Sequence, residues 1–328
     1  MDRRTFISGI AVGLLFGAQG GRTQQTKAVY RVGLVEAGAA SANQLFVDAF
    51  MAGLRDLGYL PGKNIVVDVR WAEGHAEGFR RALAELIQLR PDVLVVSSGV
   101  GALEAKRVTS SIPVVFIGVN DPIAIGLVKG LAQPGGNLTG PARVAGEGLI
   151  GKTIQVLTEI APGRSRMAIL WNPESSPMKR SLTQAQDAAR AFAMTPIPIE
   201  VRERGGLEAA FATMRKQRAD ALFVLTDPLT LDNRKVIVEL AAANRIPACY
   251  EFGEFARAGG LVAYTSSTTE QIRGAATYVD KILHGAKPGE LPIEQPTKFE
   301  LVINLKAAKA LGLTIPKDML LRADEVIQ

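Results

Sequence analysis

The sequence is poor in the residues from which many catalytic and metal centres are built. It contains one cysteine, Cys249, and two histidines, His75 and His284, among 328 residues. A single cysteine excludes an internal disulfide and a cysteine-rich metal site, and the two histidines have no partner at metal-ligand spacing. We therefore expect no metal and no cofactor. We expect Cys249 to be a small buried residue at a strand end and both histidines to lie at the surface.

Sequence motifs typical of enzymes are also missing. There is no P-loop, no G-x-S-x-G and no H-E-x-x-H. No nucleophile motif stands beside either histidine, so a serine or cysteine hydrolase would lack its base. The run VSSGVG at residues 96–101 follows a predicted strand, but Glu104 stands where a dinucleotide-binding motif has its third glycine. The sequence therefore favours a protein that is not an enzyme.

No long run of basic residues occurs, although the formal net charge is +6. Nucleic-acid binding usually needs basic residues clustered on one face, so we expect no nucleic-acid partner. Hydrophobic residues make up 47% of the chain and charged residues 21%, which is typical of a globular protein with a substantial core. The length suits two lobes of ordinary domain size.

The first twenty residues have the layout of an export signal. Arg3 and Arg4 precede an apolar run at residues 10–16, and the small residues Ala18 and Gly20 follow. The run is too short to span a bilayer, which needs about 20 apolar residues. The adjacent arginines followed by Phe6 resemble a twin-arginine signal, with an ordinary secretory signal as the alternative. Either route predicts cleavage near Gly20 and a periplasmic location.

After residue 28 the chain alternates apolar, β-branched runs with segments of helical periodicity. The first half predicts strands at 29–35, 65–69, 93–96 and 114–117 and helices at 45–57, 79–89, 102–108 and 123–131. The glycine- and proline-rich run at 133–140 approaches a crossing between lobes. The alternation then restarts, with strands at 167–171, 197–201, 221–225, 247–250 and 261–264 and helices at 179–192, 207–215, 234–244 and 272–283. This pattern predicts two α/β units in tandem, each built on a parallel sheet.

Polar side chains gather where these predicted strands end. Ligands of open parallel sheets bind beyond the carboxyl ends of the strands, so these residues are the candidate ligand contacts. The candidates are Ser41, Asn43, Ser97, Ser98, Gly99, Asn120, Asp121, Asn172, Ser175, Ser176, Asp227, Tyr250 and Glu251. Tyr250 or its neighbour Phe252 is a candidate for stacking on a ligand.

One pattern occurs twice among them. Both Asp121 and Asp227 stand at a predicted strand end and precede a proline, which suits the cap and first position of a helix. They either only cap helices or face a shared cleft, where a carboxylate would hold a ligand ammonium group. Ser97 and Ser98 have the same two interpretations, since free N–H groups at a helix start favour a carboxylate. Together these residues suggest an amino acid or a related small acid as the ligand.

Four runs resemble a known family. They are NDP with GLV at 120–128, LAQPGGNLTG at 131–140, FARAGGL at 255–261 and FELVINLKAAKALGL at 299–313. They resemble the substrate-binding proteins of ABC transporters, in the group that includes tryptophan- and tyrosine-type binding proteins. The resemblance implies a type I periplasmic-binding fold: two doubly wound parallel-sheet lobes joined by a three-segment hinge. It also implies a small-molecule ligand between the lobes and transient docking to an ABC permease with its ATPase.

The resemblance also implies a division of the chain. Residues 1–20 are the export signal, 28–142 with 267–290 form the first lobe, and 143–266 with 291–328 form the second. We expect a hinge near 141–146 and a monomer. An exported sensor of the same fold, or an α/β enzyme using Asp121, Asp227 or Glu251 as acid or base, are the alternatives.

Overall fold

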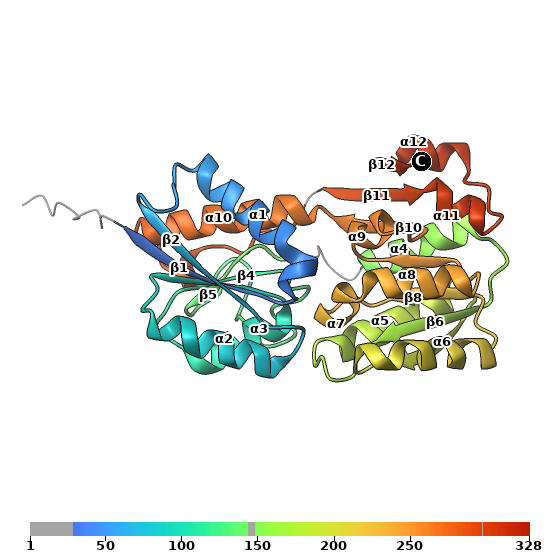
Figure 1. The fold of residues 1–328 in the computed structure, drawn as a ribbon, viewed down its shortest axis with the longest axis horizontal. Helices are drawn as coiled ribbons and strands as arrows, with labels where there is room; N and C mark the ends of the chain where they lie inside the picture. Colours follow the sequence, from blue (N-terminus) through green and yellow to red (C-terminus); the bar gives the residue numbers. More distant parts are fainter. Residues whose placement is uncertain (1–28, 144–147, 297) are drawn as a thin grey trace, which may run out of the picture.

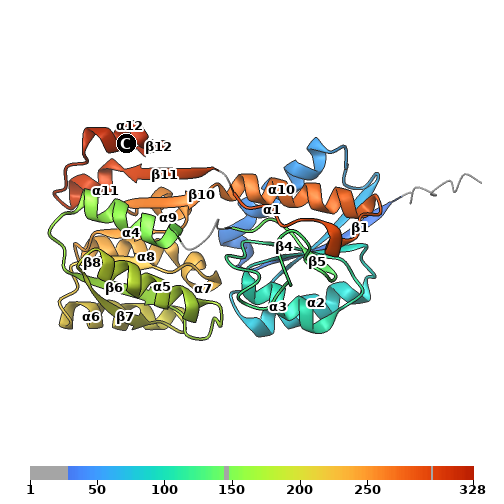
Figure 2. The same ribbon diagram turned by 180° about the vertical axis from the view of Figure 1, so that it is seen from behind.

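The computed structural model describes residues 29–143, 148–296 and 298–328. The predicted export signal at residues 1–20 therefore lies outside the described residues, and so does part of the predicted hinge near 141–146. The described chain forms two lobes side by side, each a sheet covered by helices (Figure 1, and from behind in Figure 2). None of the described helices is long and apolar enough to cross a membrane.

The first lobe holds a five-stranded parallel sheet in the order β2-β1-β3-β4-β5. Its elements are β1 (Tyr30–Glu36), α1 (Ala40–Asp56), β2 (Ile65–Trp71), α2 (Ala76–Gln88), β3 (Val93–Ser97), α3 (Gly99–Val108), β4 (Val114–Ile117), β5 (Leu138–Thr139), α10 (Thr268–Leu283) and the 3₁₀ turn η2 (Pro288–Glu290). Helices α1 and α10 pack together, and α2 packs against α3.

Strand β3 shows why this lobe is doubly wound. Its side chains alternate between two cores, because successive residues of a strand point to opposite faces. Val93 and Val95 pack with Phe50 of α1, while Leu94 and Val96 pack on the other face. Both faces are covered by helices, so a continuous β-branched run rather than a polar alternation suits this strand.

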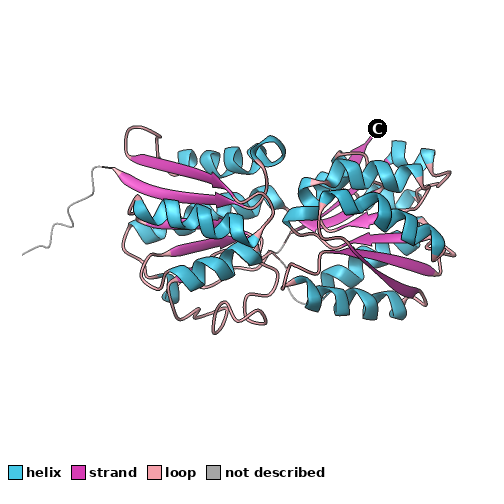
Figure 3. Ribbon diagram, turned by 60° about the horizontal axis from the view of Figure 1, so that its bottom comes forward, coloured by secondary structure: helices cyan, strands magenta, loops and turns pink. Residues whose placement is uncertain are grey.

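The second lobe holds seven strands in the order β12-β11-β10-β9-β8-β6-β7, all parallel except the antiparallel pair β10 and β11. Its elements are α4 (Gly148–Ile160), β6 (Arg166–Trp171), α5 (Met178–Ala191), β7 (Thr195–Glu200), η1 (Arg204–Gly206), α6 (Leu207–Lys216), β8 (Ala221–Val224), α7 (Pro228–Asp232), α8 (Arg234–Ala243), β9 (Ala248–Tyr250), α9 (Gly253–Arg257), β10 (Val262–Ser266), β11 (Phe299–Asn304), α11 (Leu305–Ala310), α12 (Lys317–Arg322) and β12 (Glu325–Ile327). Helices lie on both sides of the sheets (Figure 3).

The chain passes between the lobes three times: between β5 and α4, between β10 and α10, and between η2 and β11. The predicted fold class, two α/β lobes with parallel sheets, is confirmed. Cys249 is buried in β9, and both histidines are exposed, as expected.

The helix predicted at residues 123–131 is wrong. The chain forms successive turns there, and Gly126 has a φ of +70°, which a right-handed helix cannot contain. The Pro122 carbonyl accepts the N–H groups of both Leu127 and Val128, which closes the turns. Helix α4 was not predicted, although Ile150, Ile154 and Leu157 recur at helical spacing and are buried.

Candidate functional site

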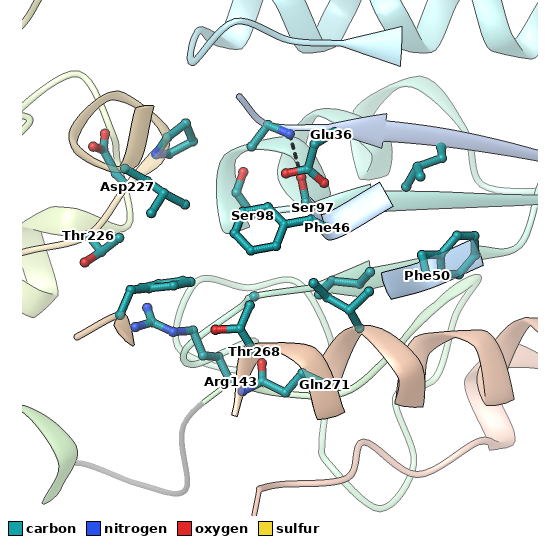
Figure 4. A pocket seen from close by; sticks show the side chains of 18 residues that line it. Glu36, Phe46, Phe50, Ser97, Ser98, Arg143, Thr226, Asp227, Thr268 and Gln271 are labelled. Carbon is teal, nitrogen blue, oxygen red and sulfur yellow. Dashed lines mark hydrogen bonds between the residues drawn. The ribbon is translucent and has the colours of Figure 1, made fainter. Parts of the chain in front are cut away.

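The carboxyl ends of the central strands of both lobes meet around one cavity. The space between protein atoms there is about 740 Å³, counted together with its opening to solvent. Side chains from both lobes line it: Leu34, Glu36, Ala37, Phe46, Phe50, Ser97, Ser98, Ile117, Gly118, Arg143, Thr226, Asp227, Pro228, Leu231, Phe252, Thr268, Gln271 and Ile272. Figure 4 shows Thr226 and Asp227 on one side of it, facing Glu36 and Ser97 across the space. We call it the interlobe cavity.

The interlobe cavity has an apolar part and a polar rim. The apolar part lies within the first lobe, where Phe46 and Phe50 of α1 and Ile272 of α10 face the sheet. The polar rim lies where the lobes meet and includes Arg143, Asp227 and Gln271. An adjoining cavity shares six of these residues: Ser98, Gly118, Arg143, Thr226, Asp227 and Pro228. It adds others, among them Asn120, Asp121, Ser175 and Arg180. Because the two cavities share these residues, they form one cleft that presents both apolar and polar side chains to a ligand.

Arg143, in the first crossing between the lobes, is braced on several sides. Its guanidinium is buried and lies 3.8 Å from the centre of the Phe252 ring. It donates to the Glu251 carbonyl at 2.8 Å and to Asn120 Oδ1 at 3.3 Å. Burial lowers the pKa of Arg143, and the nearby Glu251 and Glu254 oppose that change. Sequence reasoning missed Arg143, because it stands in a crossing rather than at a strand end.

Asp227 both caps a helix and lines the cleft, so the two interpretations of this residue do not exclude each other. Its Oδ1 accepts the Thr230 N–H at 2.9 Å, and the Thr230 hydroxyl accepts the Asp227 N–H, which makes a capping box at α7. Its Oδ2 accepts from Asn172 at 2.7 Å. Burial raises the pKa of Asp227, and these hydrogen bonds partly offset the increase.

Asp121 occupies the corresponding place in the first lobe, but it starts a turn rather than a helix. Its Oδ1 accepts the Ala124 N–H at 2.9 Å, and its Oδ2 lies 3.5 Å from a guanidinium nitrogen of Arg180 in the second lobe. Asn120, Asp121 and Ser175 line the adjoining cavity. This group of predicted residues is therefore brought together across the lobes.

The predicted serines at β3 reach the cleft and also hold local structure. Ser97 accepts the Ala37 N–H at 2.6 Å and donates to the Val35 carbonyl at 3.3 Å, which joins the ends of β3 and β1. Ser98 caps α3 by accepting the Gly101 N–H at 3.2 Å. Both line the interlobe cavity, and Gly99 lines the adjoining one.

Six other predicted residues do not line the cleft. Ser41 is exposed near the start of α1, and Ser176 is exposed and borders a separate surface cavity. Tyr250 is fully buried and stacks on Phe255 at 4.6 Å, while Glu251 is buried and its Oε2 accepts the Thr226 N–H. Asn43 and Asn172 are buried supports that donate to Asp232 and Asp227. Whether any of the thirteen candidates touches a ligand stays a prediction.

Glu36 is the most unusual lining residue that sequence reasoning missed. It ends β1, a few residues before the candidates Ser41 and Asn43 in the first turn of α1. It is 7% exposed, and burial raises its pKa to about 8. A charged residue at the end of an apolar strand was the available signal.

Hydrogen bonds from α7 and α8 close the cleft over α1. Asp232 of the second lobe accepts the Ala39 N–H at 3.0 Å and accepts from the Asn43 side chain. Arg234 donates to the Ala42 carbonyl at 2.7 Å. We call the bonds of Asp232 to Ala39 and Asn43 the Asp232 contact. The lobes are therefore joined on both sides of the cavity, by the crossings and by side chains.

Comparison with known proteins agrees with this architecture. The chain is 24% identical over 264 residues to a tyrosine-binding protein of Clostridioides difficile (strain R20291). This match covers 80% of this chain and 75% of that protein. The ABC domain from Streptococcus pneumoniae in complex with L-Trp superposes with a TM-score of 0.85 at 22% identity, over 92% of this chain and all of that one. A conserved domain protein from Vibrio cholerae gives 0.85 at 24% identity, over 91% of this chain and 99% of that one.

A family model matches nearly all of the described chain. The model is that of the ABC transporter substrate binding proteins, and it covers residues 34–327. The motifs at 120–140, 255–261 and 299–313 that suggested this family lie within the matched range. The chain therefore belongs to the family of ABC transporter substrate binding proteins.

Proposed function

We propose that this protein is exported, captures an amino acid or a related small carboxylate between its lobes and delivers it to an ABC permease with its ATPase. The observation that carries the proposal is the interlobe cavity, because both lobes line it and its apolar part suits a ring or aliphatic side chain. The relatives that bind tyrosine and L-Trp support a ligand of that kind.

Closure explains how such a protein would report its ligand. A ligand that touches both lobes is fully enclosed only when they are together, so binding shifts the population towards the closed form. The three crossings are short enough to act as a hinge, since a few residues absorb the backbone change. A permease then distinguishes loaded from empty protein by shape. The lobe limits predicted from the sequence, 28–142 with 267–290 and 143–266 with 291–328, are part of this proposal.

The test combines shape and chemistry. Small-angle scattering of the purified protein is measured with and without L-tryptophan and L-tyrosine, and the recovered ligand is analysed after long incubation. We expect a smaller radius of gyration, an unchanged ligand and the mass of a monomer. Stabilisation should follow mass action, about 2.7 kcal/mol at a hundredfold excess over Kd. Conversion of the ligand at a catalytic rate would contradict the proposal and favour an enzyme.

Export has its own test. Changing Arg3 and Arg4 to lysine should leave the precursor in the cytoplasm if the signal is a twin-arginine one. Normal export of the double variant with cleavage near residue 20 indicates the ordinary secretory route. Retention of the wild-type chain in the cytoplasm contradicts export altogether.

A further inference from the structure

Glu36 is a buried carboxyl group between Ser97 and the apolar part of the cavity (Figure 4). It ends β1 beside Leu34, and the rings of Phe46 and Phe50 line the same space. No ion pair to Glu36 occurs within the part of the chain that the structure describes. The charged group that acts on it is Asp232 of the other lobe, which has the same sign.

This environment favours the uncharged form of Glu36 at neutral pH. Burial raises its pKa to about 8, and the Ser97 hydroxyl and the Ala37 N–H only partly oppose the increase, while Asp232 adds to it. Two carboxyl groups that approach in a place of low polarity favour either a proton or a cation between them. The site is therefore suited to a positively charged group of a ligand.

The other charged groups of the cavity are already engaged. Both carboxylate oxygens of Asp227 accept hydrogen bonds from Thr230 or Asn172. Arg143 is bound to the Glu251 carbonyl and to Asn120. Helices α1 and α10 present Phe46, Phe50, Thr268, Gln271 and Ile272 to the cavity, none of which is charged. Glu36 is thus the cavity carboxyl that has neither a cation nor a helix cap to hold.

We propose that Glu36 is the counter-ion for an ammonium group of the ligand and that binding releases its proton to solvent. The carboxyl O–H bond breaks and the proton goes to water, and the carboxylate then accepts an N–H of the ammonium group, which keeps its own protons. Asp232, itself held by Ala39 and Asn43, strengthens the attraction for the cation. This inference rests on the proposed function and names the group that orients the ligand in the cavity.

The experiment is isothermal titration at pH 7 in two buffers with different ionisation enthalpies. The probes are L-tryptophan and L-tyrosine, each paired with the analogue that lacks the amino group, 3-indolepropionate and 3-(4-hydroxyphenyl)propionate. With a pKa of about 8, the protonated form of Glu36 predominates at pH 7. We expect net proton release, of at most one proton per amino acid bound, and none per des-amino analogue.

The variants are Glu36→Gln and, as a matched control, Glu104→Gln. Glu104 is also a buried glutamate of the first lobe, but it pairs with Arg107 and lies outside both cavities of the cleft. Glu36→Gln should abolish the proton release and weaken amino acid binding at least tenfold, with little effect on the analogues. Glu104→Gln should release protons like the wild type.

The outcomes separate the two proposals. Equal losses for amino acids and analogues, or wild-type binding without proton release, overturn the role of Glu36 and leave the proposed function standing. If the wild-type protein binds none of the four probes, the proposed function is overturned and this inference with it. Asp227 lines the same cavity and also has a raised pKa, so wild-type proton release supports Glu36 only if a variant of Glu36 removes it. If Glu36→Gln fails to fold, Glu36→Ala takes its place, and proton release that persists in a folded Glu36 variant overturns the role of Glu36.

Discussion

Removing Asp232 tests whether contacts between the lobes hold the closed form. Helix α1 begins without a cap of its own: Ala39 is its N-cap residue, and no acidic residue stands in its first turn. Asp232 supplies the missing acceptor from the other lobe, bound to the Ala39 N–H and the Asn43 side chain. Negative charge is favourable at a helix N-terminus, so this contact stabilises the closed arrangement specifically.

The expected size of the effect follows from these two hydrogen bonds. Asp232 is only partly buried, and on opening its carboxylate regains water, so each bond contributes about 1 kcal/mol net. Losing both in Asp232→Ala removes about 2 kcal/mol from the closed form, which corresponds to about a 30-fold increase in Kd. The stability of the separate lobes should change little, because the contact joins one lobe to the other.

The assay is ligand titration together with small-angle scattering. The matched control is Asp220→Ala, since Asp220 also accepts backbone N–H groups, from Ser165 and Arg166, but within one lobe. The control should lower the melting temperature and leave Kd unchanged. Asp232→Ala should raise Kd and leave the melting temperature of the unliganded protein nearly unchanged. Gly38→Ala gives a second route, because a Cβ there would overlap Asn43 Nδ2 and Asp232 Oδ1 and push the two side chains apart. Wild-type affinity and compaction in both Asp232→Ala and Gly38→Ala would refute the reasoning.

Three further predictions concern buried polar groups. Asp227→Asn should lower the free energy of unfolding by about 1 kcal/mol, because it weakens the α7 cap, and it should also raise Kd, because Asp227 lines the cleft. A lower free energy of unfolding with an unchanged Kd would make Asp227 a helix cap alone. Tyr250→Phe should raise the melting temperature slightly without changing Kd, because the Tyr250 hydroxyl is buried with no hydrogen-bond partner among the described residues. Weaker ligand binding by this variant would contradict the placement of Tyr250 away from the cavity. Between its unfolded pKa of 4.5 and its folded pKa of about 8, Glu36 takes up a proton when the protein folds. Its contribution to stability is therefore complete below pH 4.5 and is lost as the pH rises towards 8. Denaturant titrations should show the free energy of unfolding falling by up to about 1.4 kcal/mol per pH unit in this range, and Glu36→Gln should remove that decline.

The sequence by itself determined the architecture of each lobe. Apolar β-branched runs such as β3 and the helical segments between them reflect local periodicity, which depends only on neighbouring residues. The sequence also predicted where strands end, and several residues at those ends line the cleft: Ser97, Ser98, Asp121, Ser175 and Asp227. Local periodicity failed at 123–131, where Gly126 adopts a backbone conformation that the pattern of apolar residues does not reveal.

Only the tertiary structure decided which polar groups meet across the cleft. Asp232 contacts Asn43 from 189 positions away, and Arg143 contacts the Glu251 carbonyl from 108 positions away. Such pairs depend on how three crossings set one lobe against the other, which no local pattern records. The state of Glu36 depends on the same placement, because burial among apolar side chains and the approach of Asp232 both raise its pKa. The sequence shows that a carboxyl group is present at position 36, but its pKa is raised only by the burial and the nearby charge that the tertiary structure creates.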